Sequence, residues 1–170
     1  MRQTELTRKT PLRAKAKPKA RKPMKKRKKG SVALWKKKCD GLASKIARLP
    51  GRCLVCGATK NLQAHHLIRR NCVFYRHDLR NLVCLCPGCH EYSIELSAHG
   101  APWAFEEWMK ANKPIRYAWW VEHRHHVITG TKMDYEAIHG DLLTIYEKDK
   151  TYDWTARTLG VDPWENDHAE

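Results

Sequence analysis

The sequence predicts a small α+β protein whose centre is a strand–strand–helix unit held by four cysteines, with further helices on both sides. Two Cys-x-x-Cys pairs, at 53–56 and 86–89, are the first reason for this prediction. Two short apolar runs lie between the pairs, at 62–68 and 79–85. Apolar residues also recur at helical spacing before residue 50 and after residue 100, which predicts helices flanking that centre.

The first 30 residues carry most of the net charge of +15. They hold 14 Lys and Arg with one acid, whereas the other 140 residues hold 19 Lys and Arg with 17 acids. We expect a disordered basic arm that contacts a polyanion, most simply nucleic acid, the alternative being an arm that only improves solubility. The densest basic run consists of Lys25, Lys26, Arg27, Lys28 and Lys29.

No apolar segment follows the basic start, so we expect no signal peptide. No apolar run approaches the roughly 20 residues that span a bilayer. We therefore expect a cytoplasmic protein without a membrane partner, located in the cytoplasm of a bacterial host if a phage encodes it. An odd count of seven cysteines in a reducing compartment favours metal binding over disulfides.

The elements follow from apolar spacing and from turn residues. Gly30-Ser31 opens a leading helix over 31–50, which Pro50-Gly51 ends. Residues 51–100 form the centre, with strands at 62–68 and 79–85 and a helix from His90 toward Ala98. Residues 101–150 form a Trp-rich extension with helices at 102–110, 114–124 and 133–148, and residues 151–170 form an acidic tail.

The four paired cysteines predict a structural zinc site. The pattern is Cys53-x2-Cys56 followed by Cys86-x2-Cys89, and each pair forms a knuckle whose thiolates face one centre. Cys84 competes with Cys86, but only Cys86 repeats the spacing of the first pair, so we expect Cys84 in the core. Such a closed site stabilises a small fold and offers no open position to a substrate. The remaining cysteines, Cys39 and Cys72, are expected to be free thiols.

Several histidines and one asparagine lie between and beside the cysteine pairs. His65 and His66 are neighbours on the first strand, so their side chains are expected on opposite faces. The run His66-x14-Asn81-x8-His90, inside the four-cysteine frame, resembles the HNH endonuclease family. The resemblance covers about residues 51–99, and it implies the ββα-metal fold and divalent-metal-dependent cleavage of DNA.

The resemblance implies a role for each matching residue. His66 takes the place of the general base that activates water, and Asn81 the place of the residue that orients this base and braces the loop. His90 takes the place of a ligand of the catalytic ion. His65 stands where many members have an aspartate ligand. Nitrogen replaces oxygen there, so the expected catalytic ion is a divalent metal such as Mg²⁺, Mn²⁺ or Ni²⁺.

Other positions complete the expected site. Some members have a further histidine four residues after the helix ligand, where this sequence has Ile94, and His99 is expected to lie too far along to replace it. Water and substrate phosphate would then complete the metal shell. The arginines Arg69, Arg70 and Arg80 flank the strands and are candidates for phosphate contacts. By the resemblance, the products carry 5′-phosphate and 3′-hydroxyl ends.

A narrower likeness is to the phage NinG (Rap) recombination endonucleases, through the order LWKKKCDGLASKIARL, CLVCG, LQAHHLIRR and RNLVCLCPGCH. That group has Gly and Asn at the positions of His65 and His90. The likeness implies phage or prophage DNA processing or recombination, with branched DNA as substrate. Single-stranded DNA and RNA are alternative partners, and a non-catalytic zinc-knuckle accessory protein that binds DNA or RNA is the alternative function. HRHH at 123–126 is expected to be a helix end rather than a second metal site.

Overall fold

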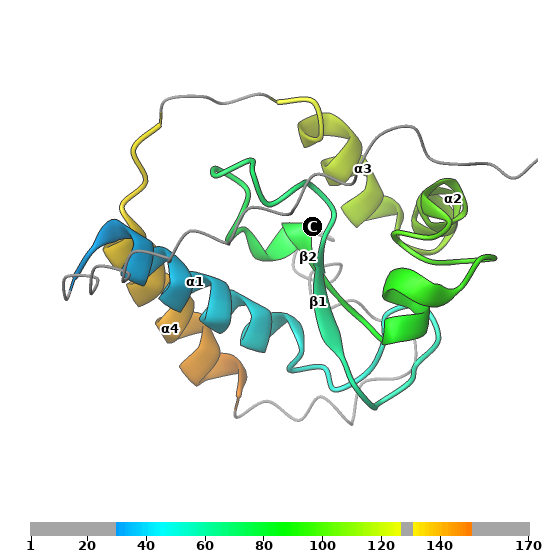
Figure 1. Ribbon diagram of the computed structural model, residues 1–170, viewed down its shortest axis with the longest axis horizontal. Coiled ribbons are helices and arrows are strands. Elements are labelled where there is room, and N and C mark those ends of the chain that lie inside the picture. Colours follow the sequence, from blue (N-terminus) through cyan, green and yellow to red (C-terminus); the bar gives the residue numbers. More distant parts are fainter. Residues whose placement is uncertain (1–29, 127–130, 151–170) are drawn as a thin grey trace, which may run out of the picture.

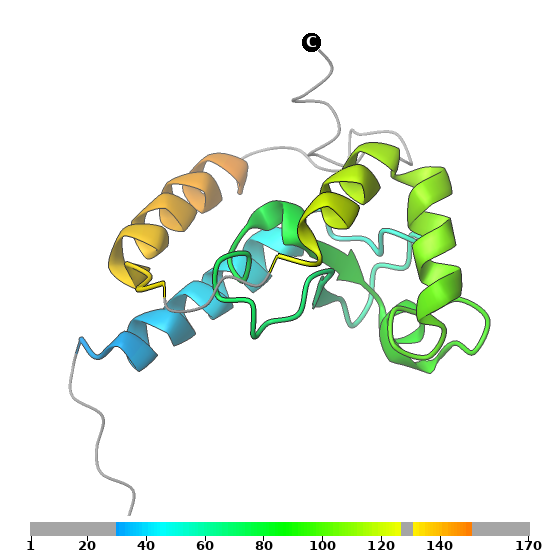
Figure 2. The same ribbon diagram turned by 90° about the horizontal axis from the view of Figure 1, so that it is seen from above.

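The computed structural model describes residues 30–126 and 131–150. A small sheet lies between two pairs of helices (Figures 1 and 2). On one side, α1 (Val32–Ala47) lies along α4 (Tyr135–Asp149), and on the other side α2 (Pro102–Asn112) is followed by α3 (Pro114–His123). The basic arm, with its run from Lys25 to Lys29, and the acidic tail at 151–170 lie outside the described residues.

The sheet is an antiparallel hairpin of β1 (Gln63–His66) and β2 (Leu82–Leu85), in which His65 pairs with Val83 and His66 with Leu82. Both strands are shorter than the apolar runs that predicted them. The first part of the second run forms η1 (Leu79–Asn81), a 3-10 turn. This turn forms because the Asp78 side chain accepts a hydrogen bond from the backbone N–H of Arg80 at 2.9 Å.

The hairpin is covered on both faces, and all four residues of β2 are buried. Alternate side chains of a strand point to opposite faces, so the strand contributes to two separate cores. Leu82 packs among residues of α1 and α4, including Leu42, Ile46 and Leu142. Val83 and Leu85 belong to the second core, which contains Cys53, Cys89, Phe105 and Met109. The cysteine region and α2 therefore share one core.

The predicted helix from His90 toward Ala98 is wrong. The helical turn η2 (Gly88–Tyr92) ends at once, and Ser93 is extended, with φ −71° and ψ 125°. The Ser93 hydroxyl accepts a hydrogen bond from Leu96 N–H at 3.1 Å, and the Ser97 hydroxyl donates to the Ser93 carbonyl at 2.6 Å. Serine side chains compete in this way with the backbone bonds of a helix, so the chain turns back on itself here.

The other helices form close to where the sequence predicts them. Both α2 and α3 begin with proline, which suits the first helical position because its missing N–H has no partner there. Phe105 and Met109 of α2 are buried, whereas Trp103 is 74% exposed. Among the described helices, none combines the length and the apolar composition required to cross a bilayer.

Candidate functional site

Two groups of side chains could hold a metal ion, and each includes one residue of the turn η2. We call the first the cysteine cluster: Cys53, Cys56, Cys86 and Cys89. Their sulfur atoms all lie within 4.8 Å of one another, and Cys53 and Cys89 are buried. The backbone shapes the first knuckle through a bond from Cys53 N–H to the Ala58 carbonyl at 2.7 Å and a positive φ of 73° at Gly57.

The cysteine cluster fits a structural zinc ion. A tetrahedral site with Zn–S bonds of about 2.3 Å has sulfur–sulfur edges of about 3.8 Å. The Cys56 and Cys86 sulfurs are 3.6 Å apart, near that edge and far from the roughly 2.05 Å of a disulfide. Cys84 is buried outside the cluster, which confirms the prediction that Cys86 takes the place beside Cys89. Burial raises the pKa of the Cys84 thiol to about 12.

The second group is the histidine cluster: His65, His90 and His99. Their ring centroids lie 5.1 Å apart for His65 and His90, and 4.9 Å apart for each pair that includes His99. One ring nitrogen from each lies within 4.8 Å of the others. His65 is buried, His90 is half-buried and His99 is exposed, so the cluster opens to solvent. A shared ion there would have room for water or a substrate oxygen.

His99 is the member that the sequence prediction left out. It reaches the cluster because the chain turns back after η2 instead of continuing as a helix. The segment that returns forms two backbone hydrogen bonds with η2. Ala98 N–H donates to the Cys89 carbonyl at 2.9 Å, and His99 N–H donates to the His90 carbonyl at 3.0 Å. Ser93, Ser97 and Gly100 are the sequence signal that could have predicted this turn, because all three disfavour a continuous helix.

Protonation of the cluster suits metal binding. The His90 Nδ1 faces the side-chain oxygen of Gln63, which can only accept, so Nδ1 carries the proton and Nε2 keeps its lone pair. Gln63 stands two residues before His65 and therefore on the same face of β1. Burial, with the neighbouring rings of His90 and His99, lowers the pKa of His65 to about 3. At neutral pH the His65 imidazole is therefore neutral, which is the form that binds metals.

His66 lies apart from the histidine cluster, at the end of β1 beside a long loop. Its Nε2 donates to the Arg76 carbonyl at 3.0 Å, so the neutral ring carries its proton on Nε2 and a lone pair on Nδ1. Burial is the main cause that lowers the pKa of His66 to about 4. His66 is not part of the group formed by His65, His90 and His99. The structure thus holds His65 and His90 together and fixes His66 separately.

Asn81 is fully buried and holds the two ends of that loop together. Its Oδ1 accepts from Ile68 N–H at 2.5 Å, and its Nδ2 donates to the carbonyls of Ile68 and Tyr75 at 3.1 and 2.8 Å. The Tyr75 carbonyl directly precedes the Arg76 carbonyl that binds His66. Asn81 therefore fixes the backbone next to the His66 acceptor.

The three arginines named as phosphate contacts have different surroundings. Arg69 is exposed, and Arg70 is exposed with Asp40 at 3.4 Å. Arg80 is paired with Asp78 at 2.7 Å, and its guanidinium lies 5.1 Å from the centre of the Trp119 ring. Arg69 is thus available to a phosphate, Arg70 is exposed but lies near the Asp40 carboxylate, and Arg80 is paired with Asp78.

The HRHH segment follows α3 and takes part in packing. His123 stacks on Trp119 with ring centroids 4.9 Å apart, and the His126 Nδ1 lies 2.9 Å from the Tyr75 hydroxyl. Arg124 forms an ion pair with Glu106 at 2.6 Å. Within residues 30–126 and 131–150, neither histidine belongs to a group that could hold a metal, in agreement with the predicted helix end.

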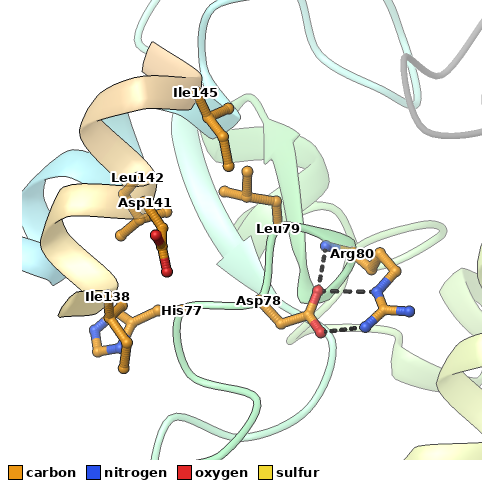
Figure 3. A pocket seen from close by; sticks show the side chains of 8 residues that line it. All are labelled: His77, Asp78, Leu79, Arg80, Ile138, Asp141, Leu142 and Ile145. Atoms are coloured by element: carbon orange, nitrogen blue, oxygen red, sulfur yellow. Dashed lines mark hydrogen bonds and ion pairs between the residues drawn. The ribbon is translucent and has the colours of Figure 1, made fainter. Parts of the chain in front are cut away.

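A hollow lies between α4 and the segment that contains η1 (Figure 3). Leu142 and Ile145 of α4 face Leu79 across it, and Ile138 lies beside His77 at one end. Its walls are mainly apolar and contain no residue of either metal-binding cluster. The hollow therefore takes no part in the chemistry considered for this site.

Comparison with protein-family models, with curated proteins and with solved structures found no significant match. Family membership is therefore not assigned. What the molecule contains is a small two-stranded α+β unit with a cysteine cluster suited to zinc and a solvent-accessible group of three histidines. Its chemistry has to be inferred from these side chains.

Proposed function

We propose that this protein is a metal-dependent endonuclease of the HNH type, which hydrolyses phosphodiester bonds of DNA. The observation that carries the proposal is the convergence of His65, His90 and His99 near a hairpin whose neighbouring histidine, His66, is held in one tautomer. A protein that only binds nucleic acid has no need of this arrangement. The cysteine cluster, holding zinc, would stabilise the fold around it.

In this proposal His66 is the general base. Its Nδ1 lone pair accepts a proton from water as the water oxygen bonds to phosphorus and the bond to the 3′ oxygen breaks. The lowered pKa keeps the ring neutral, and so able to accept the proton, throughout the neutral range. When bound at the histidine cluster, a divalent ion supplies Lewis-acid stabilisation of the negative charge that develops on the leaving oxygen. The products would carry 5′-phosphate and 3′-hydroxyl ends.

The ligand set bears on the choice of ion. Three imidazoles offer nitrogen donors only, whereas Mg²⁺ prefers oxygen. Imidazole suits Mn²⁺ less than Ni²⁺, Co²⁺ or Zn²⁺, following the usual order of affinities. We therefore propose that a transition metal supports higher activity than Mg²⁺. Addition of His99 to the predicted pair of His65 and His90 strengthens this preference.

The proposed substrate is DNA, bound first through its backbone. The first 30 residues hold 14 Lys and Arg, enough to produce affinity that falls steeply with salt and depends little on sequence. Exposed Arg69 and Arg70 at the start of the loop would add phosphate contacts near His66. Action on branched DNA in phage or prophage recombination is the narrower form of the proposal, with RNA as the alternative polymer.

The test is cleavage of supercoiled plasmid by purified protein with Mg²⁺, Mn²⁺, Ni²⁺, Co²⁺ or EDTA. We expect metal-dependent conversion to open-circular or linear DNA. The activity should fall by at least about 100-fold in His66→Ala, which removes the base. His99→Ala should require more metal for half-maximal activity. His139→Ala is the matched control, because His139 of α4 packs against Trp35 of α1 and belongs to neither cluster.

Equal cleavage by His66→Ala and wild type would rule out His66 as the base. The alternative function is that of a non-catalytic zinc-knuckle accessory protein that binds DNA or RNA. The cysteine cluster and the basic arm are the features that favour it, since neither requires catalysis. Tight, salt-sensitive binding without cleavage under any of these metals would establish this alternative.

A further inference from the structure

The loop between the strands is attached to helix α1 through one carboxylate, that of Asp40. The Arg76 guanidinium donates to both of its oxygens, from Nε to Oδ1 at 2.7 Å and from Nη2 to Oδ2 at 2.8 Å. His77 Nε2 lies 2.9 Å from Oδ1. Two consecutive loop residues therefore bind the same acid, one of them through the bidentate geometry that is strongest for such pairs.

The attachment is largely shielded from water. The side chains of Asp40, Arg76 and His77 are 22%, 14% and 4% exposed. Burial opposes ionisation of Asp40, but hydrogen bonds from Arg76 and His77 outweigh it and lower the pKa of the carboxyl to about 2. Asp40 follows Cys39 and precedes Leu42, both buried in the core between α1 and α4. The carboxylate is therefore a fixed point on a packed helix.

The same loop residue provides the hydrogen-bond acceptor for His66. The Arg76 carbonyl receives the His66 Nε2–H at 3.0 Å, while the Arg76 side chain also donates to the Arg70 carbonyl at 2.7 Å. One residue earlier in the chain, the Asn81 side chain donates to the Tyr75 carbonyl. Asn81 thus restrains the loop from inside and Asp40 restrains it from α1, with the acceptor of His66 between them.

We propose that Asp40 is a positioning residue, which acts through Arg76 to hold the ring of His66 in its Nε2–H tautomer and in its orientation toward the substrate. The inference rests on the proposed function, in which the Nδ1 of His66 accepts the proton of water. Asp40 itself touches neither substrate nor metal. Its effect is on the carbonyl that fixes which nitrogen carries the proton and where the free nitrogen points.

The role predicts a particular kinetic pattern. Binding of DNA depends on the basic residues, and Asp40→Ala removes none of them, although it takes from the exposed Arg70 a carboxylate 3.4 Å away. KM for a short duplex should therefore change by no more than about twofold. Misplacement of the base by a fraction of an ångström should lower kcat by about 10- to 100-fold. The control is Glu106→Ala, which breaks a partly buried ion pair with Arg124 between α2 and the end of α3.

A second measurement does not depend on cleavage. Nitrogen-15 NMR of the imidazoles should show His66 as the Nε2–H tautomer, with a slowly exchanging N–H, in wild type and in Glu106→Ala. His66→Gln identifies the signal by its loss. In Asp40→Ala the slow exchange should disappear and both tautomers should be populated. Asp40→Asn, which retains the shape and one acceptor oxygen, is the milder variant if Asp40→Ala does not fold.

The two readouts separate the possible failures. If wild type cleaves nothing but the His66 signal depends on Asp40, the proposed nuclease function is wrong and the positioning of the ring is right. If kcat and the His66 tautomer are both unchanged in Asp40→Ala, or in Asp40→Asn where that variant is used, Asp40 does not position His66. An equal fall of kcat in Glu106→Ala would also overturn the inference, because general loss of stability would then explain both.

Discussion

Replacement of Asn81 by alanine should remove the strongest restraint on the loop between β1 and β2. Asn81 is fully buried, and its amide forms three hydrogen bonds, at 2.5, 3.1 and 2.8 Å, to backbone groups of Ile68 and Tyr75. Truncation removes three hydrogen bonds and leaves the Ile68 N–H and carbonyl without these partners, whereas the Tyr75 carbonyl keeps a bond from Asp78 N–H at 3.2 Å. With about 1 kcal/mol for each of the three hydrogen bonds lost, we expect a loss of about 3 kcal/mol in the free energy of unfolding.

The assay is urea unfolding of zinc-loaded protein, followed by tryptophan fluorescence and circular dichroism. Asn112→Ala is the matched control. The Asn112 side chain is exposed at the end of α2 and makes one bond, to the Trp108 carbonyl at 2.9 Å, so its loss should change stability by less than about 0.5 kcal/mol. The reasoning is refuted if Asn81→Ala costs less than about 1 kcal/mol, or if both variants cost the same.

Three further predictions concern other parts of the molecule. Carbon-13 NMR should show the Asp40 carboxylate still ionised at pH 4, where an aspartate with the ordinary pKa of 3.8 is about half protonated. Because the pKa of Asp40 in the folded state is lowered to about 2, the stability that this carboxylate contributes is present above about pH 4 and is lost as pH falls toward 2. In urea unfolding, Gly100→Ala should destabilise the protein by about 1–3 kcal/mol, because the new Cβ would lie 2.9 Å from the Glu91 carbonyl. Gly41→Ala, in open space within α1, should stabilise the protein by about 0.5–1 kcal/mol, and destabilisation by both variants would contradict this reasoning. Cys89→Ser should lose the bound zinc, measured by atomic absorption, together with the core that contains Cys89, whereas Cys72→Ser should retain both; full zinc content in Cys89→Ser would argue against the cysteine cluster as the site.

The cysteine cluster was predictable because the spacing of its cysteines within each pair is a local feature of the sequence. A Cys-x-x-Cys pair forms a knuckle almost regardless of its surroundings, and two such pairs together supply the four thiolates of a tetrahedral zinc site. The same holds for the hairpin, whose strands lie inside the two apolar runs at 62–68 and 79–85. The nuclease activity, its DNA substrate and the roles of His66 and Asn81 stay predictions.

The segment after His90 shows where local reasoning failed. Its apolar residues fit a helix, but Ser93 and Ser97 bind nearby backbone groups, and Gly100 fits only because it has no side chain. The resulting reversal brings His99 to His65 and His90, nine residues from the nearest of them in the chain. The spacing of apolar residues does not predict such a turn, because the turn is stabilised by a few side-chain hydrogen bonds and not by burial of regularly spaced apolar residues.

The sequence by itself determined the ligand types, the knuckle spacings, the two strands and the basic character of the first 30 residues. Only the tertiary structure decided that His99 joins the histidine cluster and that Asp40 of α1 binds the loop next to His66. The physical reason is the range of the interactions. Spacing within a knuckle or a strand is set by neighbouring backbone geometry, whereas Asp40 and Arg76 are 36 residues apart in the chain and are brought together by the packed fold.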